Sequence, residues 1–161
     1  MKILIALSLA IMSLTLFAQS KVTLDVKLSP AGSFQGVSTK AKGDLFKVGD
    51  TFTSDKITVS IESFRTGIDL RDEHMWKHMN STQHPRAILT NLKAQNGKGT
   101  AILEVNGVKK PVAINYQVKG PSVEASFQVK ASQFGLKKAE YLGVGVNDQV
   151  GVAVTLPYKA K

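Results

Sequence analysis

The sequence predicts an all-β domain of about eight antiparallel strands with one short helix between them. Three observations favour this class: apolar and polar residues alternate with a period of two in several segments, Asn106-Gly107 lies between two such segments, and strands do not alternate with helices. Eight strands with one apolar face each can form a sandwich or close into a barrel. An eight-stranded barrel is filled by side chains or holds one ligand.

Residues 1–20 are predicted to form a signal peptide. A positively charged start is followed by an apolar run of about 15 residues, Ile3–Phe17, which is short for a membrane-spanning helix because such a helix needs about 20. Small residues follow this run, so cleavage after Ala18 or Ser20 is expected. The mature chain, residues 21–161, is then a single domain that is exported to the periplasm or secreted.

Composition narrows the function classes. The chain has no cysteine, so the exported domain has to be stable through its core alone. The formal charge is +9, but lysines and arginines are spread along the chain and aromatic residues do not interleave with them. We therefore expect no nucleic-acid partner, and attraction to an anionic membrane surface stays an open alternative.

The strands are predicted from their alternation. Val22–Leu28 and Ile57–Glu62 alternate without a fault, and Ser33–Lys42 and Ala87–Lys93 alternate more weakly. Gln149–Leu156 closes the chain with three valines on one face.

Two hairpins predict a register for the middle of the chain. Asn-Gly favours the type I′ turn of a two-residue loop, and Gly120-Pro121 is the expected second turn. Together they place one apolar face across three strands, and a slip of one residue would destroy that face. Pro111 lacks a ladder donor, so a bulge or break is expected there. The predicted apolar and polar pairs are Val105–Val108, Glu104–Lys109, Leu103–Lys110, Ala101–Val112, Val118–Val123, Tyr116–Ala125, Ile114–Phe127 and Val112–Val129.

One helix is predicted over Asp69–Asn80, where the alternation stops. Met75 and Met79 are four residues apart and Trp76 lies beside them, which gives the helix an apolar face that can cover a barrel mouth. A second short helical turn is predicted over Lys138–Leu142.

Polar residues of this helix allow two further interpretations. His74 and His78 are four residues apart and could chelate a transition metal, although His-Glu-x-x-His is not present and no third ligand is evident. We expect surface histidines instead, with a metal-binding module as an alternative. Arg71 and Asp72 are expected to be a structural ion pair, since an acidic residue suits the start of a helix.

No catalytic constellation is evident in the sequence. It has no Gly-x-Ser-x-Gly, no cysteine nucleophile and no paired carboxylates at a diagnostic spacing. Gly143-Val144-Gly145 is not followed by the residues of a phosphate-binding loop. We therefore predict that the protein is not an enzyme.

Three segments, in this order, resemble motifs of the YceI-like family of bacterial periplasmic isoprenoid-binding proteins. Thr66–Met75 resembles that family's Thr-Gly-x-x-x-Arg-Asp-x-His-Leu/Met segment, and the match continues to Leu89, with His84 where the family commonly has an aromatic residue before proline. Leu103–Val112 resembles its Asn-Gly hairpin, and Ser132–Leu136 resembles its Asp/Ser-x-Phe-Gly-Ile segment.

This resemblance implies a lipocalin-like eight-stranded barrel whose apolar tunnel binds a polyisoprenoid, such as a quinone tail or a prenyl lipid, with no other cofactor. It also implies that Arg71, Asp72 and His74 fix the helix against the barrel. Met75, Trp76 and Met79 would cover or gate one mouth. An alternative is a dry-cored accessory domain that acts through its basic surface. The residues expected to contact the lipid are Val26, Ile57, Val59, Ile61, Leu89, Ile114, Tyr116, Phe127, Val129, Phe134, Val152 and Val154.

Overall fold

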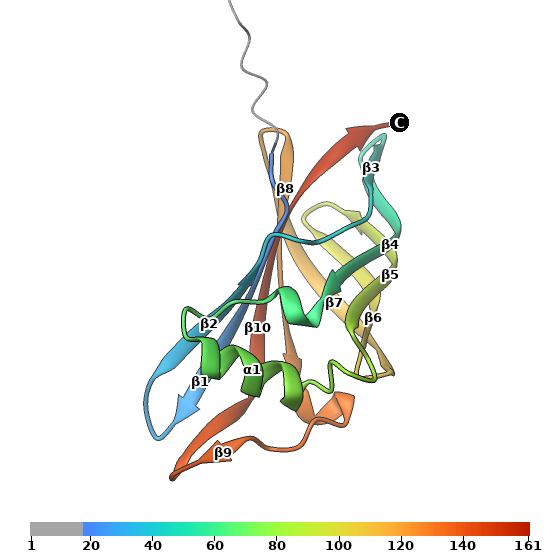
Figure 1. The fold of residues 1–161 in the computed structure, drawn as a ribbon. Coiled ribbons are helices and arrows are strands. Elements are labelled where there is room, and N and C mark those ends of the chain that lie inside the picture. Colours follow the sequence, from blue (N-terminus) through green and yellow to red (C-terminus); the bar gives the residue numbers. More distant parts are fainter. Residues whose placement is uncertain (1–17) are drawn as a thin grey trace, which may run out of the picture.

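The computed structural model describes residues 18–161, which contain ten strands and one α-helix arranged around a single barrel (Figure 1). Nearly all of the predicted signal peptide lies outside the described residues. Among residues 18–161, no helix is long and apolar enough to cross a membrane. The elements are β1 (Lys21–Ser29), β2 (Ser33–Ser38), β3 (Leu45–Val48), β4 (Thr51–Ser60), the 3-10 helix η1 (Ile61–Ser63), α1 (Asp69–His78), β5 (Arg86–Gln95), β6 (Lys98–Val105), β7 (Val108–Lys119), β8 (Ser122–Lys130), the 3-10 helix η2 (Ala131–Phe134), β9 (Glu140–Tyr141) and β10 (Val144–Ala160).

Seven strands close the barrel. In the order β10-β3-β4-β5-β6-β7-β8 each strand pairs with the next, and β8 pairs back onto β10. β1 and β2 extend the sheet from β10, and β9 pairs with the start of β10. The predicted all-β barrel is therefore confirmed, but the predicted count of eight strands is not. The difference comes from β10, whose 17 residues span about 55 Å and pair with β1, β8, β9 and β3 at different heights.

The hairpin predicted at Asn106-Gly107 forms in the predicted register. Both turn residues have a positive φ, 51° and 72°, as a type I′ turn requires. All four predicted pairs are present: Val105–Val108, Glu104–Lys109, Leu103–Lys110 and Ala101–Val112.

The second predicted hairpin forms only near its turn. Pairing between β7 and β8 ends at Asn115 and Ser126, whereas β8 stays paired with β10 along its whole length. Phe134, from η2, packs into the space beside the lower half of β7. The pairs Val118–Val123 and Tyr116–Ala125 form as predicted, and Ile114–Phe127 and Val112–Val129 are not found among the described residues.

The prediction of a bulge or break at Pro111 was wrong. Pro111 pairs with Ile102 in an unbroken register. Counted from the turn, this is a non-hydrogen-bonded pair, so the ring nitrogen faces away from β6. On that side β7 begins to pair with β8 only at Asn115, and no ladder hydrogen bond is lost at Pro111.

The long helix is confirmed and the second helical turn is not. α1 covers Asp69–His78 of the predicted segment. In place of a helical turn at 138–142, β9 forms a small hairpin with the start of β10, in which Tyr141 pairs with Val144. Leu142 and Gly143 form its loop, with φ of 49° and 77°. The sequence gives little sign of this turn because leucine is not a residue that type I′ turns favour.

α1 covers the side of the barrel where β2 and β4 do not form a continuous hydrogen-bonded ladder. In place of such a ladder, two isolated bridges join β2, β4 and the segments next to them: Val37–Arg65 and Lys42–Thr58. The helix lies across the lower half of this opening, in front of β1, β2 and β10 (Figure 1). Gly36 of β2 lets it approach closely, since a Cβ there would lie 3.4 Å from the Met75 sulfur.

Candidate functional site

The interior of the barrel contains an apolar cavity of about 990 Å³. The strands converge at one end of the molecule and spread apart toward the end that carries α1 and β9 (Figure 1). We call these the narrow end and the wide end. The cavity is lined by inward-facing residues of the strands, by one face of α1 and by the β9–β10 turn. A volume near 1,000 Å³ is at the upper end of the range for sites that hold one small molecule, about 300–1,000 Å³.

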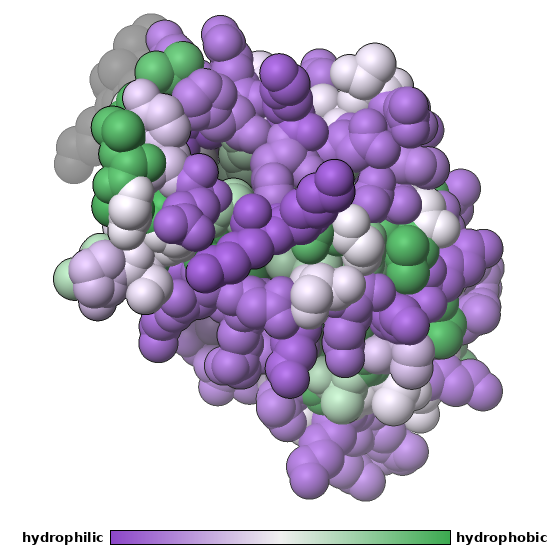
Figure 2. Space-filling model, turned by 90° about the horizontal axis from the view of Figure 1, so that it is seen from below, coloured by the Kyte–Doolittle hydropathy of each residue, from purple (hydrophilic) through white to green (hydrophobic). Residues whose placement is uncertain are grey.

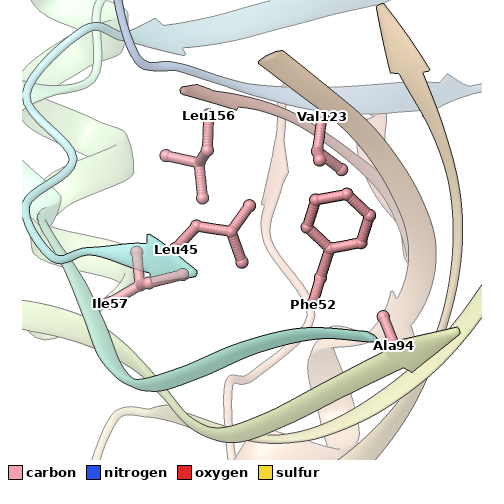
Figure 3. Packing of buried hydrophobic residues seen from close by; sticks show 6 residues of the cluster. All are labelled: Leu45, Phe52, Ile57, Ala94, Val123 and Leu156. Atoms are coloured by element: carbon pink, nitrogen blue, oxygen red, sulfur yellow. The ribbon is translucent and has the colours of Figure 1, made fainter. Parts of the chain in front are cut away.

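The narrow end is closed by packed side chains. Leu45, Phe52, Ile57, Ala94, Val123 and Leu156 point toward one another inside the barrel (Figure 3). The Phe52 ring stands edge-on to Tyr116 and to Tyr158, with ring centres 5.4 and 5.2 Å apart. Such edge-to-face contacts stabilise an aromatic cluster beyond simple burial. This cluster is the floor of the cavity.

The structure brings together eleven of the twelve residues that the sequence assigned to a lipid site. All of them line the cavity except Ile61. Ile61 is 1 % exposed, but β4 ends at Ser60 and the 3-10 turn η1 begins at Ile61, so the alternation of the strand does not continue to it. The eleven are Val26, Ile57, Val59, Leu89, Ile114, Tyr116, Phe127, Val129, Phe134, Val152 and Val154.

Two of the three predicted gate residues lie at the cavity. Met75 and Met79, one helical turn apart, line it, whereas Trp76 does not. The next position on a helix is rotated by about 100°, and this directs Trp76 toward the chain before α1. There its indole nitrogen donates to the Phe64 carbonyl oxygen at 3.1 Å, and the Arg65 guanidinium lies 4.7 Å from its ring centre. Trp76 anchors the helix.

Asp72 is the buried polar centre that holds the start of α1. Its carboxylate accepts hydrogen bonds from the Thr66 backbone nitrogen at 2.7 Å and the Thr66 hydroxyl at 2.6 Å. Burial alone would raise its pKa, but these hydrogen bonds and the charges of Arg65 and Arg71 outweigh burial and lower the pKa below the ordinary 3.8. The Thr-Gly…Arg-Asp motif thus folds the chain before the helix back onto it.

Arg71 and two histidines are the polar side chains that α1 presents to the cavity. Arg71 donates to the Thr66 carbonyl oxygen at 2.8 Å, and its guanidinium lies 4.6 Å from the Phe34 ring centre. Its Nε is buried and has no hydrogen-bond partner among the described residues. His74 is largely exposed. Burial lowers the pKa of His78 from its ordinary 6.5, so the ring is neutral at pH 7, which suits an apolar lining.

The described part of the chain contains no cluster of metal ligands of the kind that the metal-binding alternative requires. Residues 18–161 contain no group of three His, Cys, Asp or Glu side chains placed to hold a metal ion. His84, the third histidine, lies instead against the β6–β7 turn, where a Cβ on Gly107 would be 2.6 Å from its ring.

The three segments that resemble family motifs meet at this turn. The Asn106 side chain donates to the Phe134 carbonyl oxygen at 3.1 Å and accepts a hydrogen bond from the Asn80 amide at 3.1 Å. Gly107 makes room for His84. The hairpin, the segment after α1 and η2 are therefore locked together beside the cavity, which holds Phe134 in its lining position.

Several lining residues were missed by sequence reasoning. Phe52 is one, because the buried face of β4 changes between Ser54 and Ile57, with Asp55 and Lys56 both exposed. On the neighbouring strand β5, opposite this change of face, Asn91 has a φ of 55°, and the register of β5 against β6 shifts at the same point. A strict period of two cannot follow such a change of face. Other missed lining residues had the signal of simple alternation or were isolated in loops: Val22, Leu24, Leu28, Phe34, Leu45, Leu92, Leu103, Val123, Leu142 and Leu156.

Comparison with known proteins assigns the family. The model of the YceI-like domain matches residues 15–158. The chain belongs to the YceI-like family. This is a family of binding domains, and the three resembling segments are spread across the matched region. No curated protein matches the chain significantly.

Solved structures share this YceI-like fold. BcnA of Burkholderia cenocepacia has a TM-score of 0.67 at 18 % identity, over 87 % of this chain and 96 % of that one. A polyisoprenoid-binding domain of Saccharophagus degradans, implicated in plant cell wall breakdown, has a TM-score of 0.65 at 14 % identity, over 88 % and 94 %. A CJ YceI protein variant with a monobromobimane guest has a TM-score of 0.56 at 17 % identity, over 80 % and 86 %.

Proposed function

We propose that the protein binds one isoprenoid or similar amphiphilic lipid in its barrel and carries it in the periplasm, without catalysing a reaction. The observation that carries the proposal is the apolar cavity of about 990 Å³, which runs from the wide end to the aromatic floor. Both the family and a polyisoprenoid-binding neighbour support a lipid as the ligand.

The chemistry of the lining fits a long apolar chain. Its strands contribute aliphatic and aromatic side chains, and its methionines, Met75 and Met79, come from α1 and from its C-terminal cap, where a flexible thioether can adapt to a flexible ligand. Burying such a chain is favourable by about 25 cal/mol per Å² of apolar surface, less the cost of ordering it. The head of the ligand would lie at the wide end, where the unpartnered Nε of Arg71 is a donor for an oxygen atom.

The competing interpretation is a dry-cored domain that acts through its basic surface. A cavity of this size in a packed interior argues against it, since protein cores leave few voids larger than a water molecule. The chain does carry a formal charge of +9. A lipid carrier uses the cavity, and a surface-acting domain does not.

Organic-solvent extraction of the exported protein, followed by mass spectrometry, tests the proposal. We expect one lipid per protein molecule, with an isoprenoid or comparable chain. The delipidated protein should take up a prenyl quinone at the same ratio. An empty extract together with no uptake of any offered quinone would contradict lipid binding and favour the surface-acting domain.

A further inference from the structure

The turn between β9 and β10 has an unusual residue at its tip. Leu142 has a φ of 49° and Gly143 a φ of 77°, in a two-residue loop flanked by Tyr141 and Val144. Asparagine, aspartate and glycine are favoured in such a loop, whereas a leucine with positive φ is strained. The Leu142 side chain is also 85 % exposed. Backbone preference and hydration both disfavour leucine here, so its presence calls for a partner that covers it.

Further apolar residues are exposed at the same end of the barrel. Tyr141 is 71 % exposed, and Val144, Ile68 and Leu70 are exposed as well. The start of α1, the β1–β2 turn and the β9–β10 turn all lie at the wide end (Figure 1). The view from below shows hydrophobic patches set in a largely hydrophilic surface (Figure 2). All five residues also line the cavity, so this exposed apolar rim is continuous with the interior.

Charged groups beside the rim indicate the chemistry of the partner. Lys137 and Lys138 are exposed and are separated from β9 only by Ala139, and the Lys138 ammonium lies 3.9 Å from the Glu140 carboxylate. The acidic residues Asp69 and Glu73 are on α1 and Glu140 pairs with Lys138, so within residues 18–161 Lys137 is the cation of this segment that makes no salt bridge. Lysines next to an exposed leucine and tyrosine are typical of segments that bind anionic lipid headgroups while apolar side chains enter the interface. The whole chain is basic, with a formal charge of +9.

We propose that the β9–β10 turn docks the barrel on an anionic phospholipid surface, with Leu142 and Tyr141 inserted and Lys137 and Lys138 at the headgroups. Docking in this way holds the cavity mouth against the bilayer. An apolar chain can then move between membrane and barrel without crossing water. The route of transfer rests on the proposed lipid-binding function, whereas the docking surface is a separate property that vesicles alone can test.

The decisive variant is Leu142→Asn. Asparagine suits the positive φ of this turn, so the variant should fold with equal or higher stability. Flotation of the exported protein, its N-terminus checked by mass spectrometry, is measured with vesicles of phosphatidylcholine and phosphatidylglycerol. We expect Leu142→Asn to bind these vesicles at least tenfold more weakly than the wild type. Lys137→Gln with Lys138→Gln should weaken binding several-fold on these vesicles and leave any binding to pure phosphatidylcholine unchanged.

The matched control is Val48→Asn, because Val48 is an exposed valine beside the β3–β4 turn at the opposite end of the barrel (Figure 1). Its vesicle binding should equal that of the wild type. Equal binding by Leu142→Asn and the wild type would overturn the proposal. The proposal would also be overturned if the wild type did not bind vesicles but formed a dimer that the Leu142→Asn substitution dissociates, since the turn would then contact a second copy.

The measurements distinguish a failure of the docking proposal from a failure of the lipid-binding proposal. Uptake of a short, water-soluble prenyl quinone without vesicles should be the same in the wild type and in Lys137→Gln, because Lys137 is not a lining residue of the cavity. Normal uptake without wild-type vesicle binding overturns the docking surface alone. Vesicle binding that depends on Leu142, without uptake of any quinone, supports docking and contradicts the proposed function.

Discussion

The two ends of the barrel use the same alternating strands for different purposes. At the narrow end, Leu45, Phe52 and Leu156 are buried against one another, and two tyrosines complete an edge-to-face aromatic cluster. At the wide end, Leu24, Phe127 and Val129 are only half-buried although they face the interior, because no side chain of residues 18–161 fills the space between the walls. An apolar inward face therefore does not by itself specify a packed core.

The difference arises from what closes the barrel at each height. At the narrow end short strands complete the ring, since β3 pairs with both β4 and the end of β10. At the wide end the wall has two openings, which α1 and η2 cover. A helix packs farther from the barrel axis than a strand in the sheet would, and it therefore widens the interior. The narrow end should determine stability and the wide end should determine binding.

The strongest test of this division introduces a carboxylate at each end. Val123→Asp buries an unpaired charge in the packed floor and should cost on the order of 4 kcal/mol or more of unfolding free energy. Val129→Asp faces the cavity, where water can reach it in the ligand-free protein, and should cost about 1–2 kcal/mol while it abolishes lipid retention. Urea denaturation and lipid extraction measure the two effects. Lipid retention at the wild-type level in a folded Val129→Asp protein would contradict the cavity assignment.

Two phenylalanines provide a matched pair of smaller changes. Phe52→Ala removes the centre of the floor and should lower the free energy of unfolding by about 3–5 kcal/mol. Phe127→Ala should cost less, about 1–2 kcal/mol, because that side chain is half-buried, but it should weaken prenyl-quinone binding about tenfold. Denaturation and binding titrations on both variants check this. Equal stability losses would show that the wide end is packed as tightly as the narrow end.

Asp72→Asn sharpens the comparison, because Asp72 holds α1 over the wide end. We expect a loss of about 1–3 kcal/mol in unfolding free energy at pH 7, since Oδ1 of Asp72 accepts both Thr66 hydrogen bonds and asparagine replaces this charged acceptor with a neutral one and the oxygen that faces Arg65 with an amide nitrogen. The folded pKa of Asp72 lies below its ordinary 3.8, so its contribution is complete above that pH and is lost as the pH falls through the folded pKa. The difference in unfolding free energy between the wild type and Asp72→Asn should therefore become smaller below pH 3.8. A gap that stays constant down to pH 2 would exclude a charged Asp72 as its source.

The smallest effects are expected from alanine in place of glycine at the two ends. In Gly99→Ala the new Cβ would lie 2.6 Å from the Ala94 Cβ and 2.9 Å from the Lys93 carbonyl oxygen, so backbone has to shift, at a cost of about 1–3 kcal/mol. In Gly36→Ala it would meet the flexible Met75 thioether at 3.4 Å, at a cost below about 1 kcal/mol. Thermal denaturation of both variants measures this. A larger loss at Gly36 would mean that α1 is rigidly packed.

Local signals explain which parts of the fold could be predicted. The Asn106-Gly107 hairpin, α1 and β1 depend on nearby residues, and the sequence indicates each of them directly. The closure of the barrel depends on where the 17 residues of β10 find partners that are distant in the chain, and no local pattern encodes that. The count of strands was therefore wrong.

The site was predictable where the alternation is regular and was missed where it is broken. Ile61 was assigned to the lipid-contacting residues because it continues the alternation of Ile57 and Val59, but the strand ends one residue earlier and Ile61 is buried away from the cavity. Phe52 was overlooked because the change of face at Asp55-Lys56 hides it. Leu142 was assigned to a helical turn because its hairpin has leucine in place of asparagine or aspartate before Gly143. That departure from turn chemistry is also the basis for the docking surface.

A titration of the delipidated protein with prenyl quinones of increasing chain length tests the central claim most directly. We predict binding of one molecule per barrel, with an affinity that rises steeply with each added prenyl unit and then levels off when the chain reaches the Phe52 floor. Binding that does not saturate at one molecule, or an affinity that does not depend on chain length, would contradict an apolar cavity that holds a single lipid chain.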